Sequence, residues 1–421
     1  MKRALILTVG TGTRSDVKIT QPLIKTIRNS HPDFLALAVS SESKKFAEAI
    51  VQELALAGDR YRIVQLTLPD DVQSVFREIN GVIRDTMQQG FGPQEIEVDF
   101  TSGTKAMTGG AVLSAVFHFC GSLKYITGER KNGVVMDGAE KFLSISPESI
   151  FALQELYLAR RFILELRFEP ALKILNSINP NLLDEYQRML LENLEKAARA
   201  YSCWEAFDHK RFSGYYGKIN LSQPEVLPFR VQGDIPNRLV GISKTLKSGK
   251  VTADVLADVF NNAGRRFAEG KFDDALSRLY RLTEMLAQWE LSKPPTEINS
   301  SDVDIQKIPS EKKSYFDGLR DKKDGKIRIG LQKSYELLDF LGSPLGGLFL
   351  NDKKIQALLA KRNYSILAHG TEPISREACQ SLFELVEALV VSRIDKFQDL
   401  RRELDFPWRV RHAPEGQLST S

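Results

Sequence analysis

The first 145 residues alternate apolar runs with stretches of helical character, and this alternation constrains the fold more than any other feature. Ala4–Val9 (ALILTV) and Phe34–Val39 (FLALAV) are apolar at nearly every position, as expected of strands buried on both faces of a sheet. Further strands are expected at Ile63–Leu68, Glu95–Phe100 and Leu123–Thr127. Strands that alternate with helices predict a Rossmann-like α/β domain with a mostly parallel, doubly wound sheet over residues 1–145.

The pattern changes after Pro147, where apolar residues recur at helical spacing. We expect a helical linker or middle domain over residues 146–250 and a second helical domain over residues 251–421. In the second domain, helices are predicted over 251–292, with a turn at Gly270, and over 331–341, 353–369 and 375–404. The predicted fold class is therefore an α/β N-terminal domain followed by an all-α C-terminal region.

Composition narrows the classes of protein that this chain can be. No apolar run approaches the ~18–20 residues of a membrane span, and the short apolar start runs directly into a glycine turn. The three cysteines are far apart and odd in number, which fits neither a disulfide framework nor a zinc site. We expect a cytoplasmic protein with no membrane contact, no metal and no cofactor. With a net charge of only +4, any binding of nucleic acid has to be local.

A glycine- and hydroxyl-bearing loop follows the first strand. Its residues are Gly10, Thr11, Gly12 and Thr13, and the sequence continues toward a helix. Glycines allow a sharp turn and close approach to a ligand, and a helix N-terminus offers free N–H groups to an anion. The loop departs from the dinucleotide fingerprint, since Ser15 replaces its third glycine, and it has no Walker lysine. A tight strand-to-helix turn without a ligand is the alternative.

A second loop of this kind follows the strand at Glu95–Phe100. It contains Thr101, Ser102, Gly103, Thr104 and Lys105. In a parallel sheet both loops lie at the carboxyl ends of the strands, where ligands bind at the point of strand reversal. Hydroxyls, backbone amides and the charge of Lys105 can cradle phosphate and ribose there. Ser41, after another strand, is expected at the same pocket. The alternative is that these hydroxyls only cap helices.

A third motif lies near the C-terminus and consists of Arg362, Asn363 and His369. On a helix, a spacing of seven residues is nearly two turns, which places Arg362 and His369 on one face. A histidine can act as general acid or base in the attack of a ribose 2′-hydroxyl, and a guanidinium can stabilise charge on the phosphorus oxygens. Asn363 can orient the phosphate or the imidazole. The alternative is a histidine that faces the C-terminal end of a helix dipole.

The pairing of TVGTGT with DFTSGTKAMTGG resembles the CRISPR-associated Rossmann-fold sensor domain, the CARF domain, over residues 1–145. The arginine–polar–histidine pattern resembles the HEPN ribonuclease signature. The CARF–HEPN resemblance implies a homodimer that binds a cyclic tetra- or hexa-adenylate as its allosteric activator. The residues at Gly10–Thr13, Ser41 and Thr101–Lys105 would line the ligand site. Arg362, Asn363 and His369 from two protomers would form the catalytic cleft.

The function implied is a cyclic-oligoadenylate-activated, metal-independent endoribonuclease of type III CRISPR antiviral defence. It would cut single-stranded RNA by 2′-hydroxyl attack and leave a 2′,3′-cyclic phosphate. Two other hypotheses stay open. The chain can be a non-catalytic sensor that reports on the ligand to a helical interaction or DNA-binding module. The sensor domain can also be a slow ring nuclease, in which Thr11, Thr101 and Ser102 position a ribose of the ligand for self-attack.

Overall fold

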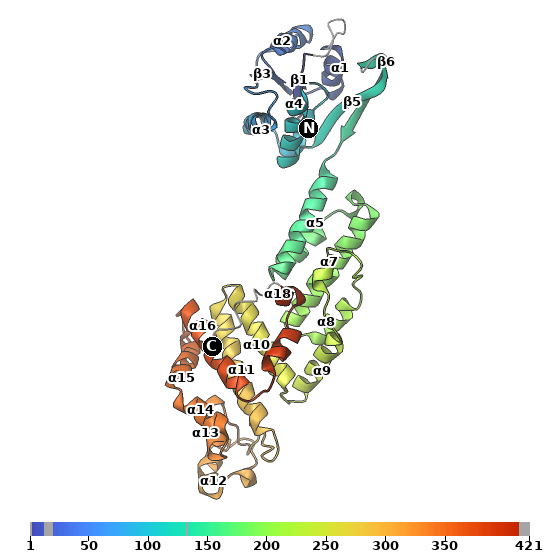
Figure 1. The fold of residues 1–421 in the computed structure, drawn as a ribbon. Helices are drawn as coiled ribbons and strands as arrows, with labels where there is room; N and C mark the ends of the chain where they lie inside the picture. The colour runs from blue at the N-terminus through green and yellow to red at the C-terminus, as the bar shows by residue number, and fades with distance from the viewer. Residues whose placement is uncertain (1, 12–19, 132–133, 412–421) are drawn as a thin grey trace. The chain divides into compact units, whose positions relative to one another are not determined.

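The computed structural model describes residues 2–11, 20–131 and 134–411, and the chain forms two compact units (Figure 1). The first unit contains Met1–Tyr157 and Ile178–Gln187, and the second contains Leu158–Ser177 and Arg188–Ser421. The chain thus passes from the first unit to the second within one helix. The division at residues 145 and 250 that we expect from the sequence stays a prediction.

A six-stranded sheet forms the centre of the first unit. Its strands are β1 (Ala4–Val9), β2 (Phe34–Val39), β3 (Tyr61–Gln65), β4 (Ile96–Asp99), β5 (Ser122–Lys131) and β6 (Val134–Ile145). They lie in the order β3-β2-β1-β4-β5-β6, and all neighbours are parallel except β5 and β6. The predicted Rossmann-like, mostly parallel sheet followed by helices is confirmed.

Strand order reverses next to β1, and this determines where a ligand can bind. Ala4 of β1 pairs with Phe34 of β2 on one side and with Ile96 of β4 on the other. The chain therefore leaves β1 toward one edge of the sheet and later crosses to the opposite edge. In such sheets the crevice outside the carboxyl ends of the strands, at the point of reversal, is the usual ligand site.

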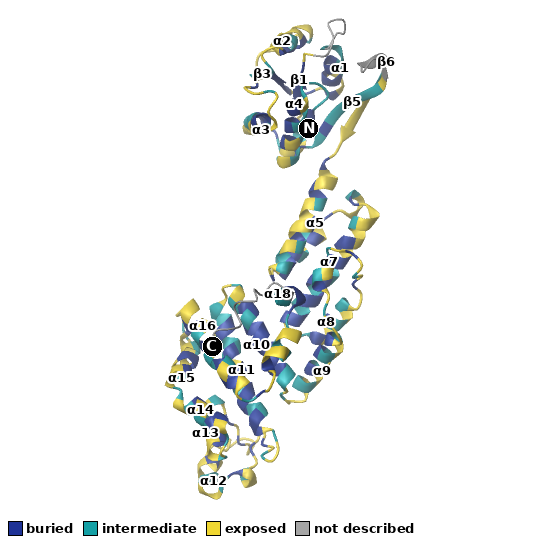
Figure 2. Ribbon diagram, in the orientation of Figure 1, coloured by how far each residue is buried: buried dark blue, intermediate teal, exposed yellow. Residues whose placement is uncertain are grey.

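Helices cover both faces of the sheet. They are α1 (Thr20–Ser30) and α2 (Lys44–Glu53) on one face, and α3 (Val72–Gln88) and α4 (Lys105–Phe117) on the other. Alternate residues of β1 supply the two cores: Leu5 and Leu7 pack toward α1 and α2, whereas Ala4 and Ile6 pack toward α3 and α4. Figure 2 shows the burial that results, with β1 buried and the outer helix surfaces exposed. This double burial explains why β1 and β2 are apolar at every position except Thr8.

The rest of the chain is helical. Its α-helices are α5 (Glu148–Leu164), α6 (Phe168–Ser177), α7 (Glu185–Glu205), α8 (His209–Tyr216), α9 (Ile235–Lys247), α10 (Ala253–Ala268), α11 (Phe272–Leu291), α12 (Ser310–Asp317), α13 (Leu331–Phe340), α14 (Pro344–Asn351), α15 (Lys353–Ala360), α16 (Arg376–Val391), α17 (Phe397–Glu403) and α18 (Pro407–Arg411). The 3₁₀ turns of the whole chain are η1 (Pro93–Glu95), η2 (Pro180–Leu182), η3 (Leu227–Phe229), η4 (Ile305–Lys307) and η5 (Lys361–Tyr364). Among the described residues, no helix is long and apolar enough to cross a membrane.

Two predicted helices end earlier than the sequence pattern indicates. The turn at Gly270 between α10 and α11 is confirmed, and its φ of +74° explains the glycine. The helix predicted over 353–369, however, stops at Ala360 and tightens into η5. The helix predicted over 375–404 is broken after Val391 and resumes at Phe397, because Lys396 adopts a left-handed φ of +58°.

A buried cluster of charges joins α7, α8 and α10 to the segment that precedes α18. Arg265 of α10 is fully buried, and its guanidinium bonds to Glu205 of α7 and, at 2.9 Å, to Asp405. The carboxylate of Asp258 lies 3.9 Å from Arg265 and accepts hydrogen bonds from Trp204 and His209, both at 2.8 Å. Helices far apart in the sequence therefore share one set of compensated charges.

Replacement of Arg265 by methionine should destabilise the second unit strongly. The change removes Arg265 as the common partner of the buried carboxylate of Glu205 and the half-buried carboxylate of Asp405, which costs about 3–5 kcal/mol. Arg281→Met is the matched control, because its exposed pair with Glu284 contributes about 1 kcal/mol at most. Guanidinium unfolding followed by circular dichroism measures both changes. Equal midpoints for the two variants would contradict the structural role given to this cluster.

Candidate functional site

Four loops meet at the carboxyl ends of the parallel strands and enclose a cavity of about 450 Å³. The loops follow β1, β2, β3 and β4. The lining residues are Gly10, Thr11, Ser40, Ser41, Glu42, Pro69, Asp70, Thr101, Ser102, Gly103, Thr104 and Met107. The cavity lies at the point of strand reversal, where a doubly wound sheet binds its ligands. Gly12 and Thr13, which the sequence places in the same loop as Thr11, lie outside the described residues.

The loops after β1 and β4 touch through glycine. A Cβ at Gly10 would lie 2.7 Å from the backbone nitrogen of Gly103, so no larger residue fits there without displacement of backbone. The N–H of Gly10 donates to the Ser102 hydroxyl at 3.0 Å, and the buried Thr8 hydroxyl donates to the Ser102 carbonyl. Gly103 itself has a φ of +119°. These contacts hold the two loops as one wall of the cavity.

Threonine hydroxyls fix the remainder of the β4 loop. Thr104 caps α4, since its oxygen accepts the N–H of Met107 at 3.1 Å, and it donates to the carbonyl of Pro69 at 2.6 Å. The Thr101 oxygen accepts the N–H of Ile126 in β5 at 3.0 Å. The helix-capping alternative raised by the sequence is therefore correct for Thr104, yet Thr104 also lines the cavity.

The described residues of the cavity offer an anion hydrogen-bond donors rather than side-chain cations. Lys105 is exposed and is not among them, and none of the described residues that line the cavity is a lysine or arginine. The N–H groups of Ser102 and Gly103 have no acceptor in the described part of the chain, and they precede α4, whose N-terminal end favours negative charge. Two exposed carboxylates, Glu42 and Asp70, also line the cavity.

The residues of the third motif lie on a loop rather than on one helix. Arg362 and Asn363 belong to η5, and His369 belongs to the segment that leads to α16. The argument that Arg362 and His369 share a helix face is therefore wrong, because the helix ends at Ala360. The loop instead folds back on itself, and the N–H of His369 donates to the Asn363 carbonyl at 3.3 Å. The side chains of Asn363 and His369 are exposed.

Two residues that the sequence pattern does not mark make this fold-back possible. Ser365 is fully buried, and its N–H and hydroxyl both donate to the Arg362 carbonyl, at 3.1 and 2.9 Å. A Cβ at Gly370 would lie 2.0 Å from the Tyr364 carbonyl oxygen, so the chain can pass there only as glycine. Gly370 is thus a close-contact residue of the loop that carries Arg362, Asn363 and His369.

Tyr280 of α11 is a further member of this site that sequence reasoning missed. The Arg362 guanidinium lies over its ring, 4.8 Å from the ring centre. Burial raises the pKa of the Tyr280 phenol, the neighbouring Glu284 raises it further, and Arg362 opposes both effects. Tyr280 therefore stays protonated at neutral pH and supports Arg362 by a cation–π contact. The sequence gives no local signal for this contact, because Arg362 and Tyr280 lie more than 80 residues apart. The one general hint is that arginine often stacks on an aromatic ring.

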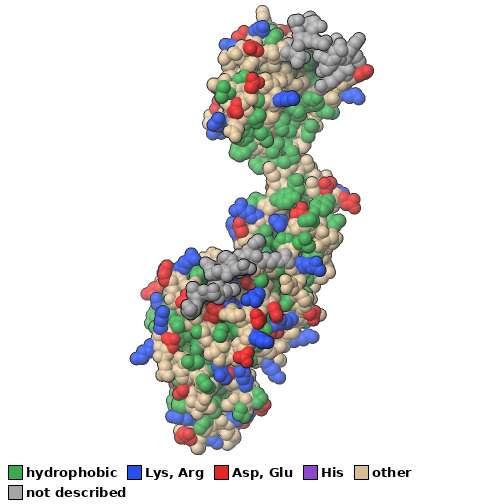
Figure 3. Space-filling view, in the orientation of Figure 1, with side chains coloured by type: hydrophobic (Ala, Val, Ile, Leu, Met, Phe, Trp, Pro, Cys, Tyr) green, Lys and Arg blue, Asp and Glu red, His purple; other side chains and the backbone are tan. Residues whose placement is uncertain are grey.

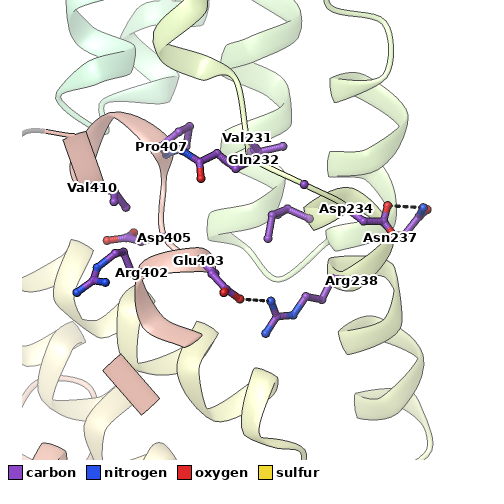
Figure 4. A pocket seen from close by; sticks show the side chains of 12 residues that line it. Val231, Gln232, Asp234, Asn237, Arg238, Arg402, Glu403, Asp405, Pro407 and Val410 are labelled. Carbon is purple, nitrogen blue, oxygen red and sulfur yellow. Dashed lines mark hydrogen bonds and ion pairs between the residues drawn. The ribbon is translucent and has the colours of Figure 1, made fainter. Parts of the chain in front are cut away.

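A larger cavity, of about 860 Å³, lies in the second unit between the start of α9 and the segment from α17 to α18 (Figure 4). Its charged residues are engaged with other side chains. Arg238 bonds to Glu403 at 2.6 Å and to Asp254 through two bonds, and Asp234 accepts from Asn237 at 2.6 Å. A cavity whose charges are already paired has few groups left to recognise a ligand, so we do not assign it a function.

The charges of the protein are otherwise dispersed. On the face shown in Figure 3, lysines and arginines alternate with aspartates and glutamates over the helical unit. Within the described ranges, no group of three or more histidine, cysteine, aspartate or glutamate side chains is arranged to hold a metal ion, and the three cysteines are free.

The C-terminal region matches a known family. Residues 245–392 match the model of the Csm6 HEPN domain, and this range contains Tyr280, Arg362, Asn363 and His369. A search of curated proteins gives no match.

The whole chain resembles a solved structure in its fold. Csm6 of Enterococcus italicus, bound to cyclic hexa-2′-fluoro-hexa-dAMP, is similar with a TM-score of 0.51 at 13% identity, over 97% of this chain and 100% of that one. A type III CRISPR defence DNA nuclease activated by cyclic oligoadenylate matches at 14% identity over 58% of this chain and 35% of that one, with a TM-score of 0.25. The second likeness is too low to say anything about fold.

The fold and the domain match define a two-part protein, in which an α/β domain with a cavity at its strand reversal is followed by a HEPN domain. The chain has the fold of that Csm6 structure, and its residues 245–392 match the Csm6 HEPN domain. The family resemblance that the sequence shows is thereby confirmed.

Replacement of Gly10 by alanine should separate the two loops of the cavity wall. The new methyl group meets backbone of Gly103, and the displacement should cost about 1–3 kcal/mol. Gly81→Ala on α3 is the control, because a Cβ there meets no atom within 4 Å and alanine favours a helix. Differential scanning calorimetry of the two variants tests this. An unchanged midpoint for Gly10→Ala would show that the loops do not touch as described.

Proposed function

We propose that this protein is a cyclic-oligoadenylate-activated, metal-independent endoribonuclease that cuts single-stranded RNA in type III CRISPR antiviral defence. The observation that carries the proposal is the pairing of a cavity at the strand reversal of the α/β domain with a HEPN domain of the Csm6 type on one chain. The relative from Enterococcus italicus is bound to a cyclic oligoadenylate analogue, which supports the same ligand class here.

The cavity suits an adenylate ligand in two respects. Phosphate and ribose oxygens can accept hydrogen bonds from the free N–H groups of Ser102 and Gly103 and from the hydroxyls of Thr11 and Ser41, the last of which is exposed. The carboxylates of Glu42 and Asp70 would repel a phosphate, but they can accept hydrogen bonds from the exocyclic amino group of adenine. We assign phosphate contact to the loop after β4 and base contact to these carboxylates.

The loop from Arg362 to His369 supplies groups that can assist an RNA strand in cleaving its own backbone through a 2′-hydroxyl. The ribose 2′-oxygen attacks the adjacent phosphorus, its proton passes to a base, and the bond to the 5′-oxygen breaks as that oxygen takes up a proton. His369 is exposed and can transfer either proton, whereas Arg362, backed by Tyr280, stabilises charge on the non-bridging oxygens. Asn363 orients the phosphate. The products are a 2′,3′-cyclic phosphate and a 5′-hydroxyl.

A second copy of the chain would complete the cleft. Each motif loop carries one Arg362 and one His369, and the same loop exposes three large apolar side chains. Tyr364, Ile366 and Leu367 are 61%, 67% and 48% exposed. A cluster of exposed apolar residues beside charged ones is typical of a contact surface. We infer a homodimer in the prokaryotic cytoplasm, in which ligand binding favours the cleavage-competent arrangement.

The direct test is cleavage of a fluorescent single-stranded RNA in EDTA, with and without cyclic tetra- or hexa-adenylate. Cleavage should require the ligand and should fall about 10²-fold or more in His369→Ala and Arg362→Ala. His31→Ala, an exposed histidine of the α/β domain, is the control and should cut normally. Ligand binding without cleavage would favour the non-catalytic sensor, and cleavage only with added metal would refute the mechanism.

The contact between Tyr280 and Arg362 gives a separate prediction. Tyr280→Leu removes the ring face on which the guanidinium rests and should lower kcat about tenfold, with KM little changed. Tyr280→Phe retains the ring and should restore the rate. Single-turnover cleavage at saturating RNA measures both variants. A phenylalanine variant as slow as the leucine variant would show that the hydroxyl, not the ring, is what matters.

A further inference from the structure

A short basic segment leads directly into the loop that carries Arg362, Asn363 and His369. Residues 353–362 read KKIQALLAKR and contain four basic residues and no acidic one. Their net charge of +4 equals that of all 421 residues, so basic and acidic residues are equal in number over the rest of the chain. The segment forms α15 and the start of η5. It is therefore an exception to the even mixture of charges elsewhere in the protein.

The packing of α15 decides which of its residues face solvent. Ile355, Leu358 and Leu359 are buried and form its inner side. The side-chain amide of Gln356 donates to two carbonyls at the end of α14, at 3.0 and 2.9 Å. These contacts fix the rotation of the helix about its axis, so its opposite side faces solvent.

Lysines occupy this solvent side of α15. Lys353, Lys354 and Lys361 are exposed, and we call these three residues the basic face. Lys361 directly follows the helix and keeps helical dihedral angles. Positions 354, 357 and 361 are three and four residues apart, so Lys354 and Lys361 share one side of the helix, about 10 Å apart along its axis. The residue between them on that side is Ala357, which is exposed. The two ammonium groups can therefore contact different phosphates of one strand.

The ammonium groups of the basic face form no ion pair within the described residues. The nearest carboxylate along the chain, that of Asp352, caps α15 and accepts the N–H groups of Lys354 and the next residue, at 2.9 and 3.0 Å. Its charge is thus directed at the helix start rather than at a lysine side chain. A lysine without an ion pair can bind a phosphate without first giving up a carboxylate partner.

The basic face ends at the groups proposed for cleavage. Lys361 immediately precedes Arg362 in η5, and Tyr364, which is 61% exposed, ends the same turn. A strand that places its scissile phosphate at Arg362 can extend its neighbouring phosphates along α15. An exposed tyrosine ring also offers a surface on which a base can stack. The exposed residues of α15 include no large apolar side chain, and such side chains are the usual anchors of a protein partner.

We propose that the basic face of α15 is a subsite for the substrate strand, in which Lys353, Lys354 and Lys361 bind phosphates beside the scissile bond. The inference rests on the proposed function, because it states how the same site holds single-stranded RNA. The three lysines are positioning residues and take no part in proton transfer. Contacts to phosphate carry no sequence information, so the subsite contributes affinity and register but no base preference.

The subsite is tested by binding of a fluorescent single-stranded RNA to the full chain with His369→Ala, so that the RNA stays intact. Replacement of all three lysines of the basic face by glutamine should weaken binding about tenfold at low salt. The slope of log Kd against log salt concentration should fall by about 2, since each phosphate contact to a single strand contributes about 0.7. Replacement of the same three lysines by arginine keeps the charges and should restore binding.

A matched control removes the same charge elsewhere in the same unit. Lys244, Lys247 and Lys250, at the end of α9, are also exposed and form no ion pair within the described ranges. Their replacement by glutamine lowers the net charge equally and should leave RNA binding and its salt dependence unchanged.

Cleavage kinetics with His369 intact separate positioning from chemistry. The glutamine variant of the basic face should raise KM for a long RNA about tenfold and change kcat less than twofold, because Arg362 and His369 are untouched. A fall in kcat at unchanged KM would contradict a role in holding the strand.

The outcomes distinguish this subsite from the proposed function. If the glutamine variant binds RNA as tightly as its parent, or if the α9 control weakens binding equally, the basic face is not a subsite. A glutamine variant that binds RNA normally but changes its oligomeric mass in light scattering would assign the face to a contact between two copies, and this too would overturn the subsite. If RNA binding depends on the basic face but cyclic tetra- or hexa-adenylate never induces cleavage, the proposed function fails and the subsite stands.

Discussion

The contact between the ends of β1 and β4 is the constraint on which the α/β domain of this protein depends. These strands are neighbours in the sheet but lie about 90 residues apart in the sequence, and their loops must meet without a side chain between them. Gly10 and Gly103 allow that contact, and the hydrogen bond from Gly10 to Ser102 holds it. The backbones of the loops after β1 and β4 touch and form one wall of the cavity, and the loops after β2 and β3 form the rest.

Hydroxyl groups connect the loop after β4 to its neighbouring strands and loops. Thr8 fixes Ser102 from within the sheet, Thr104 joins the start of α4 to the loop after β3, and Thr101 reaches β5. Each hydroxyl satisfies backbone groups that would otherwise be buried without partners. The loop after β4 is thus held by its own side chains, and its N–H groups stay available to a ligand. The threonine, serine and glycine residues of the loop after β4 therefore both hold the loop in place and line the cavity.

Much of the α/β domain could be predicted from its sequence, because burial on both faces of a strand shows directly in its composition. Ala4–Val9 and Phe34–Val39 are apolar at every position except Thr8, since both sides of each strand are covered, and that pattern locates the sheet and the ends of its strands. The sequence could not decide the orientation of Lys105. A lysine at the first position of α4 can turn toward the cavity or toward water, and only the packed loop shows that it lies in water.

The helical half could be predicted less well, because its site depends on where a helix stops. The residues from Lys353 to His369 have the composition of a continuous helix, yet the chain leaves the α-helix after Ala360. Buried Ser365 bonds back to Arg362, and Gly370 passes against Tyr364, so tertiary contacts override the local preference. A continuous helix would have separated the backbones of Arg362 and His369 by about 10 Å, which is nearly two helix pitches. The fold-back instead exposes Asn363 and His369 on one short loop and leaves Arg362 supported by Tyr280.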